Sequence, residues 1–128
     1  MSDSELGSAV RPHLRDEKVR LAVSCYLGAG LSRAVLAVTD RRVLMVRSAY
    51  WSIRDKGLLW ADPLEEVALS ELPRELRAKG AYTGNTYLRL RRADGSTVKV
   101  NPRAGFAGDH DQTRRNVAQL YRLVEGRF

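Results

Sequence analysis

The residues of this sequence that could do chemistry are cations set in a strand pattern. In the stretch LRLRRADGSTVKV, residues 88–100, Arg89 and Arg91 alternate with leucines, and Lys99 lies between two valines. Alternate residues of a strand share one face. If the two halves of the stretch form a hairpin, the three cations lie on one polar face, where they can bind phosphate groups or an acidic surface.

The register of this hairpin follows from keeping its apolar side chains together. A two-residue turn would place Leu90 opposite Lys99 and would mix the buried face with the solvated one. A three-residue loop over residues 93–95, with Gly95 in the left-handed conformation, pairs Leu90 with Val98 instead. We therefore expect the three-residue loop.

In that register the polar face sets like charges side by side, with Arg89 opposite Lys99 and Arg91 opposite Thr97. Like charges directly opposite each other on a sheet cost about 0.2–1 kcal/mol, which favours a third group that neutralises them. The first candidate binding site combines these cations with a further arginine and a neighbouring ring: Arg89, Arg91, Lys99, Arg103 and Tyr87. The competing interpretation is a solvated sheet face whose long side chains splay apart.

A second candidate site lies in AYWSIRDKGLLW, residues 49–60. Aromatic rings can sit at the headgroup level of a membrane while cations meet anionic lipid, and the same groups can contact a partner protein. The residues of this candidate are Tyr50, Trp51, Arg54, Lys56 and Trp60. The alternative is that its tryptophans, with Ile53 and Leu59, belong to the core, in either a twisted strand pair or a loop folded over the core.

No catalytic or metal-binding set is predicted. The acids and histidine of DHD, residues 109–111, are adjacent at a helix start and cannot all point at one ion, whereas helix capping explains the acids. Neither the histidines nor Glu65 and Glu66 form a set of nucleophile, base and orienting group, and the sequence has no glycine-rich phosphate loop. We expect a noncatalytic protein with no cofactor and no metal.

Charge and composition bound the class of protein. The net charge of +7 favours an anionic partner, and the excess is concentrated in residues 81–128, which hold nine Lys or Arg against four Asp or Glu. The single cysteine, Cys25, lies among apolar residues, which indicates a small buried side chain and a reducing compartment. No apolar run approaches about eighteen residues. We expect a cytoplasmic protein, either free or peripheral to the inner face of the membrane.

The first half of the chain predicts three strands. Residues 19–27 alternate, with one face formed by Val19, Leu21, Val23, Cys25 and Leu27. Residues 35–38 and 43–46 are apolar at every position, so they predict paired strands in the middle of a sheet, joined at TDRR. Because both faces are apolar, the pattern leaves the register of this pair open.

The remaining segments predict a further strand and a helix at each end. EVALSEL, residues 66–72, is typical of a strand. The N-terminus is weakly helical, with Ser4 as a cap and an end at Pro12. Near the C-terminus, Asp109 or Asp111 caps a helix that ends at Gly126 and carries an apolar stripe formed by Val117, Leu120, Tyr121 and Val124. The stripe needs a surface, and a curled antiparallel sheet provides one.

This order of elements, with VLAVTDRRVLMV and LRLRRADGSTVKV, resembles the pleckstrin-homology-like domains of small bacterial proteins. In those domains a TDRR-type hairpin is followed by a PLEEV-type strand start, here residues 63–67. The resemblance implies an α+β, mainly β fold: a bent antiparallel seven-stranded barrel or sandwich capped by a C-terminal helix. The length of 128 residues predicts one domain over residues 1–128. The resemblance covers about residues 14–128 and implies residues 1–14 as an N-terminal extension, 15–105 as strands and 109–126 as the capping helix. The apolar hairpin is then central, with both faces covered.

The resemblance also implies binding rather than catalysis, because the fold serves lipids, peptides and other proteins. Its phosphoinositide-binding members carry basic residues around the loop between the first two strands. Here Lys18 and Arg20 lie at the other end of the first strand, and only Arg33 matches. We expect a binding or scaffold module that docks onto a protein partner or an anionic membrane surface through its basic sheet face. Two alternatives stay open: sequence-independent nucleic-acid binding, and a subunit that assembles through sheet edges, for example as a homo-oligomer.

Overall fold

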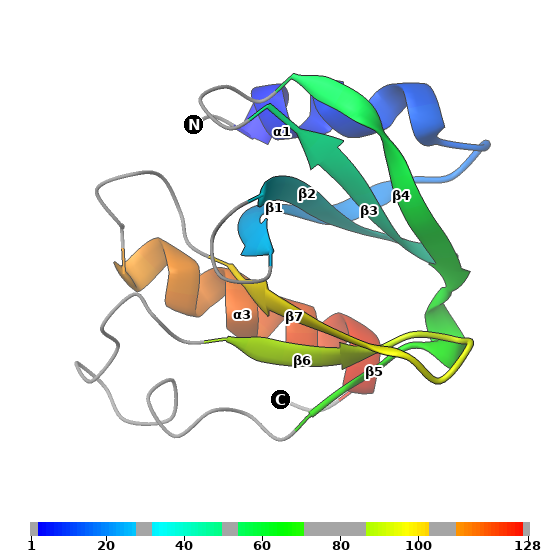
Figure 1. The fold of residues 1–128 in the computed structure, drawn as a ribbon, viewed down its shortest axis with the longest axis vertical. Coiled ribbons are helices and arrows are strands. Elements are labelled where there is room, and N and C mark those ends of the chain that lie inside the picture. The colour runs from blue at the N-terminus through cyan, green and yellow to red at the C-terminus, as the bar shows by residue number, and fades with distance from the viewer. Residues whose placement is uncertain (1–2, 28–31, 50–53, 71–86, 103–109, 127–128) are drawn as a thin grey trace.

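The computed structural model consists of one bent antiparallel sheet with helices at both ends of the chain (Figure 1). It describes residues 3–27, 32–49, 54–70, 87–102 and 110–126. Within these ranges seven strands follow in the order β4-β3-β2-β1-β7-β6-β5. The sheet is not closed into a barrel, because β4 and β5 stay at its two edges. The expected seven-stranded, mainly β fold with a C-terminal helix is confirmed.

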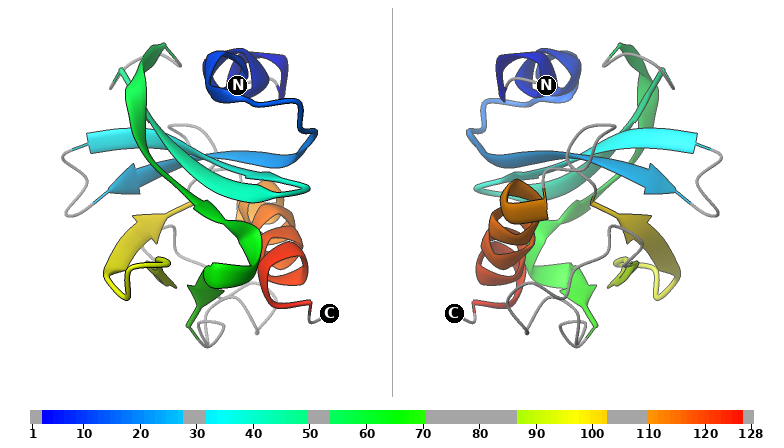
Figure 2. Two further views of the ribbon diagram at one scale, coloured as in Figure 1. Left: turned by 90° about the vertical axis from the view of Figure 1, so that its right-hand side faces the viewer. Right: turned by 90° about the vertical axis from the view of Figure 1, so that its left-hand side faces the viewer.

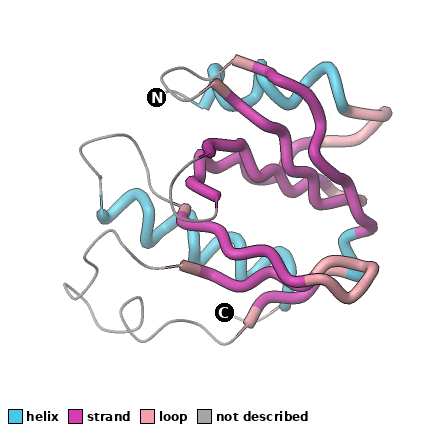
Figure 3. The backbone as a smooth tube through the Cα atoms, viewed as in Figure 1, coloured by secondary structure: helices cyan, strands magenta, loops and turns pink. Residues whose placement is uncertain are grey.

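The strands form two runs that meet at β1. The first run contains β1 Val19–Leu27, β2 Ser32–Thr39, β3 Arg42–Ser48 and β4 Asp55–Pro63. The second run contains β5 Ala68–Leu69, β6 Leu88–Arg91 and β7 Thr97–Asn101. Only the end of β1, at Tyr26 and Leu27, pairs with β7. Figure 3 shows the runs as two layers of strand.

The helices connect and cover these layers. Helix α1 Asp3–Val10 and the 3-10 turn η1 Arg11–His13 precede β1, and the 3-10 turn η2 Leu64–Glu66 joins β4 to β5. Helix α3 His110–Glu125 follows β7. Figure 2 shows α1 on one side of the β1–β4 layer and α3 on the other.

The β2–β3 hairpin is buried at nearly every position, as its apolar sequence predicts. Its register, which the pattern leaves open, pairs Val38 with Val43 and Val35 with Val46 across a turn at Asp40 and Arg41. Because successive strand residues face opposite sides, the hairpin supplies two separate apolar surfaces. One surface consists of Ala34, Leu36, Val38, Val43 and Met45, and the other of Val35, Ala37, Leu44 and Val46.

Each surface has its own cover. The first belongs to the main core cluster, which α3 completes with Val117, Leu120 and Tyr121. The second is covered by α1 through Leu6, Ala9 and Val10. The expectation that both faces of the hairpin are covered is therefore confirmed. The sequence does not predict that the N-terminal extension covers a face of the hairpin. The weak helical pattern of residues 3–10 does not indicate which surface the helix packs against.

Strand β1 departs from strict alternation at its start. The expectation that Val19 shares a face with Leu21 is wrong: Val19 packs with the α1 cluster, whereas Leu21 packs with the main core. The pairing with β2 shifts register between these two residues. A bulge inserts one extra residue, so the side chains before it change face.

The sequence pattern predicts the structure of the segments after β3 only in part. Residues 55–63 form a single edge strand on β3, so the loop interpretation is wrong for them. The expected strand pair is not tested, because residues 50–53 lie outside the described residues. The strand expected over residues 66–72 is reduced to Ala68–Leu69, because residues 64–66 turn in η2, while residues 71 and 72 lie outside the described residues.

The C-terminal helix is confirmed with its stripe and its end. Gly126 has a positive φ of 66° and donates its N–H to the carbonyl of Arg122 at 3.0 Å. Of the two expected caps, Asp109 lies outside the described residues and Asp111 lies in the first turn. The Tyr121 hydroxyl donates to the carbonyl of Ser70 at 2.7 Å, which fixes α3 against the strand after η2.

The two-sided burial predicts equal sensitivity on the two faces of the hairpin. Leu36→Ala and Leu44→Ala, on opposite faces and both fully buried, should each lower the free energy of unfolding by about 2–5 kcal/mol. Urea denaturation measures both, with Leu59→Ala as a control because Leu59 is 47% exposed. A loss at Leu44 as small as that of the control would mean that α1 does not cover this face.

Candidate functional site

The β6–β7 hairpin has one buried face and one charged face, as expected. Leu88, Leu90 and Val100 are fully buried beneath α3. Strand residues between them point the other way, so Arg89, Arg91 and Lys99 are exposed on the side turned away from α3. We call these three residues the basic face.

The pairing within the basic face is also the expected one. Arg89 lies directly opposite Lys99, and Arg91 lies opposite Thr97. Gly95 has a positive φ of 89° and donates to the carbonyl of Arg92 at 2.9 Å, while the N–H of Arg92 donates to the carbonyl of Ser96 at 2.8 Å. The three-residue loop therefore holds the cations in a fixed register.

The other two residues of the first candidate site are not part of this strand pair. Tyr87 is half-buried immediately before β6. Arg103 lies outside the described residues. The structure thus brings together three of the five residues that the sequence singled out.

The cations of the basic face have no acidic partner among the described residues, whereas the next arginine does. The guanidinium of Arg92 donates from Nε to Oδ2 of Asp62 at 3.0 Å and from its terminal nitrogen to Oδ1 at 3.3 Å. It also lies over the ring of Trp60, 4.8 Å from the ring centroid. Arg92 therefore ties the β6–β7 turn to the end of β4.

A second ionic cluster fixes the TDRR turn. The Glu17 carboxylate, with a side chain 1% exposed, accepts hydrogen bonds from the guanidinium of Arg42 and, at 2.7 Å, from the hydroxyl of Thr39. The Thr39 hydroxyl in turn accepts from the N–H groups of Arg41 and Arg42 at 3.0 and 2.9 Å. These bonds, Arg42 first, lower the pKa of Glu17 to about 2. Thr39 and Arg42 therefore have a structural role, which is to hold this turn.

The second candidate site divides into exposed and packed residues. Tyr50 and Trp51 lie outside the described residues, and Arg54 and Lys56 are exposed. Trp60 packs against the main core and carries Arg92 on its ring. The position of Trp60 fits the core alternative, whereas Leu59, which that alternative also places in the core, is 47% exposed, so the alternative is wrong for Leu59.

The sequence pattern does not predict that two leucines of the same strand are exposed. Leu58 and Leu59 are 42% and 47% exposed. Met45 pairs with Trp60 and Val46 with Leu58, so Leu59 is an extra residue on the β4 side. A bulge of this kind has no signature in the alternation of the sequence, so their exposure could not be predicted.

Arg33, which matches the basic position of the resembled family, is an interior residue. It is 1% exposed, donates to the hydroxyl of Ser24 at 2.7 Å and lies over the ring of Tyr26 at 5.1 Å. An arginine so enclosed holds strands together. It does not offer its charge to a ligand at the surface.

His13 and Asp55 form a pair that the sequence did not suggest, because they are 42 positions apart. His13 Nε2 lies 2.9 Å from Asp55 Oδ2 and joins η1 to the start of β4. Burial raises the pKa of Asp55, but the hydrogen bonds from His13 and from the N–H of Gly57 outweigh it, so the pKa is lowered. The pair adds a further tie between the N-terminal segment and the sheet.

The single cysteine is enclosed, and the described part of the chain has no cluster of metal-binding side chains. Cys25 is fully buried, and burial raises the pKa of its thiol to about 12, so the thiol stays protonated. Within the described ranges no three His, Cys, Asp or Glu side chains gather as a metal site would require. None of the helices described is both long and apolar enough to cross a membrane.

Comparison with known proteins finds no family model that matches the chain and no matching curated protein.

Glu17 makes the stability of the fold depend on acid. Its pKa is about 2 in the folded protein against 4.5 for the free side chain, so its contribution is complete above pH 4.5 and is lost as the pH falls towards 2. The loss amounts to about 3 kcal/mol at most. The difference in unfolding free energy between wild type and Glu17→Gln should therefore shrink across this window.

Urea denaturation at a series of pH values measures this difference. Glu65→Gln serves as the control, because Glu65 is exposed and forms no ion pair with a described residue. A constant gap between wild type and Glu17→Gln from pH 6 to about pH 2 would contradict the assignment of the lowered pKa to this cluster.

Proposed function

We propose that this protein is a noncatalytic binding module of the pleckstrin-homology-like type, which docks onto an anionic membrane surface through its basic face. One observation carries the proposal. Arg89 and Lys99 are exposed, directly opposed and without an acidic partner in the described part of the chain. In contrast, Arg42 and Arg92 are each neutralised by a carboxylate.

The energetics favour an anion at this place. Opposed like charges on neighbouring strands cost about 0.2–1 kcal/mol, and a phosphate between them relieves the repulsion. Each cation near an anionic membrane contributes about 1 kcal/mol, so the three residues of the basic face supply about 3 kcal/mol. That corresponds to roughly hundredfold enrichment at the surface. The association is therefore reversible and sensitive to salt.

The edge strand β4 carries a second group of exposed residues whose chemistry suits a lipid surface. Leu58 and Leu59 are exposed there, and Arg54 and Lys56 in the same segment are exposed too. Apolar side chains beside cations suit the interface of an anionic membrane, where the former enter the acyl boundary and the latter meet headgroups. The same residues belong to the second candidate segment of the sequence.

The two alternatives have less support. Binding of single-stranded nucleic acid relies on stacked aromatic rings, whereas the three residues of the basic face include none and Tyr87, immediately before β6, is half-buried. Assembly through the β4 edge is disfavoured by its two register shifts, since bulges interrupt the ladder that a second strand would extend.

The proposal predicts that reversing the charge of the basic face abolishes vesicle binding. In sedimentation with phosphatidylcholine vesicles containing about 30% phosphatidylserine, Arg89→Glu/Lys99→Glu should bind at least about thirtyfold more weakly than wild type. Wild-type binding should itself fall steeply between about 50 and 200 mM salt. The matched control is Arg11→Glu/Arg47→Glu, which changes the net charge equally at two exposed positions.

A second readout separates loss of the site from loss of the fold. Lys99→Glu alone turns a repulsive cross-strand pair into an attractive one, so it should raise the free energy of unfolding by about 0.2–1 kcal/mol while weakening vesicle binding. Equal weakening by both double variants would mean that net charge, not the basic face, drives binding. Binding to duplex DNA but not to vesicles would favour the nucleic-acid alternative and contradict the proposal.

A further inference from the structure

Strand β1 has an edge that no described strand covers. One side of β1 pairs with β2 from Val19 to Leu27. The other side pairs with β7 at Tyr26 and Leu27 alone. Over residues 19–25 this second edge has no strand partner in the described part of the chain. In an antiparallel strand about half of the N–H and C=O groups point towards each edge. Beyond the register shift between Val19 and Leu21 the ladder is regular, so residues 21–25 offer an open row of donors and acceptors.

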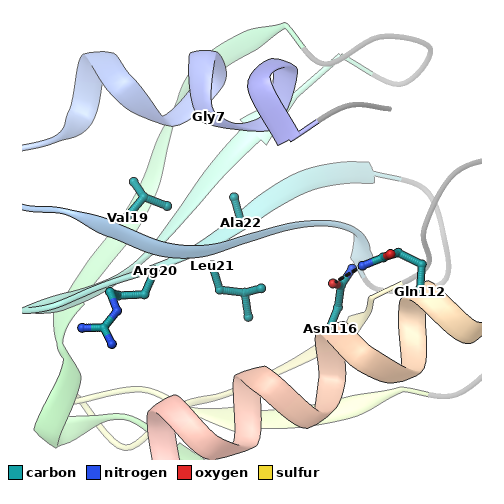
Figure 4. A pocket seen from close by; sticks show the side chains of 7 residues that line it. All are labelled: Gly7, Val19, Arg20, Leu21, Ala22, Gln112 and Asn116. Carbon is teal, nitrogen blue, oxygen red and sulfur yellow. Dashed lines mark hydrogen bonds between the residues drawn. The ribbon is translucent and has the colours of Figure 1, made fainter.

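A cavity of about 350 Å³ lies along this edge. It is lined by Gly7 of α1, by Val19–Ala22 of β1, and by Gln112 and Asn116 of α3. Figure 4 shows Val19 and Ala22 directed towards α1 and Arg20 and Leu21 towards α3, so the β1 edge runs between the two helices. Its volume is at the lower end of the range of about 300–1,000 Å³ typical of ligand pockets.

The walls of this groove leave room and offer polar contacts. At Gly7 an added Cβ would meet nothing within 4 Å, so the α1 wall is set back from the strand. On the α3 wall, Arg115 donates to Gln112 Oε1 at 2.9 Å, and Gln112 Nε2 donates to Asn116 Oδ1 at 2.8 Å. Asn116, whose oxygen accepts from Gln112, also has an amide nitrogen that can donate to an occupant of the groove.

We propose that an extended peptide segment bearing an acidic side chain binds in this groove as an added strand on β1. An unpaired strand edge is matched by main-chain N–H and C=O groups in an extended conformation, which a peptide supplies at every second residue. Ala22 and Leu21 offer apolar contacts to alternate side chains. Arg20 is exposed and has no ion pair with a described residue, so it selects a carboxylate near the mouth of the groove.

The peptide groove and the basic face are separate sites. The groove is formed by α1, β1 and α3, whereas the basic face lies on β6 and β7, turned away from α3. The groove therefore goes beyond the proposed membrane function, and either proposal can fail without the other.

Selection from a random heptapeptide library tests the groove, with immobilised wild-type protein as the target and Gly7→Phe as the counter-target. Phenylalanine at this position fills the space beside β1, while the matched control Gly7→Ala leaves it open. Enriched peptides should carry an acidic residue and should bind Gly7→Ala as they bind wild type. Gly7→Phe should bind them at least about tenfold more weakly, and Arg20→Glu should also weaken binding.

Amide hydrogen exchange identifies the mode of binding for an enriched peptide. Bound peptide should slow exchange within residues 19–24, and Arg89→Glu/Lys99→Glu should bind it as wild type does. Thermal melting and circular dichroism establish that Gly7→Phe is folded, and Asn116→Leu provides a second variant that should weaken binding. The proposal is overturned if no peptide is enriched over the counter-target, or if enriched peptides protect residues away from β1. A dimer that Gly7→Phe converts to a monomer, without peptide enrichment, would assign the groove to a second copy of the chain instead.

Discussion

Exclusion of water from both faces of the β2–β3 hairpin is the constraint on which the rest of the structure depends. A strand pair that is apolar at every position cannot lie at a surface, so each face needs its own apolar cover. Helix α3 and the second run of strands cover one face, and α1 covers the other. Strand β1 is thereby enclosed between two helices, and the outer face of β6 and β7 is left to solvent. Both proposed binding sites are consequences of this arrangement.

Charge is distributed according to the same division. Where segments distant in the chain are joined, a carboxylate meets an arginine, as Glu17 meets Arg42 and Asp62 meets Arg92. Arg33 is enclosed altogether and holds its neighbours. The cations that remain outside these clusters are candidates for a partner. The net positive charge therefore indicates a binding surface only after the arginines that are ion-paired or buried in the fold have been excluded.

The sequence predicts the parts of the fold that depend on local periodicity. Alternation within β6 and β7 fixes their register because only one pairing keeps all apolar groups together, and the spacing of the α3 stripe marks its buried face in the same way. Side-chain pairs such as His13 with Asp55 cannot be predicted, since they join segments whose distance is set by the complete fold. The bulges that turn Val19 to the other face and expose Leu59 are equally invisible, because each adds one residue to a pairing that the sequence does not specify. The basic face can therefore be predicted from the sequence, whereas the groove beside β1 cannot.

Native-state hydrogen exchange of the β2–β3 amides tests the central claim most directly. If water is excluded from both faces, the amides of Leu36 and Leu44 exchange only when the whole domain unfolds, with the free energy measured for global unfolding. Amides of β6 should exchange through smaller openings, because that strand is covered on one face alone. Exchange of the hairpin amides at a lower free energy than those of β6 would contradict the account.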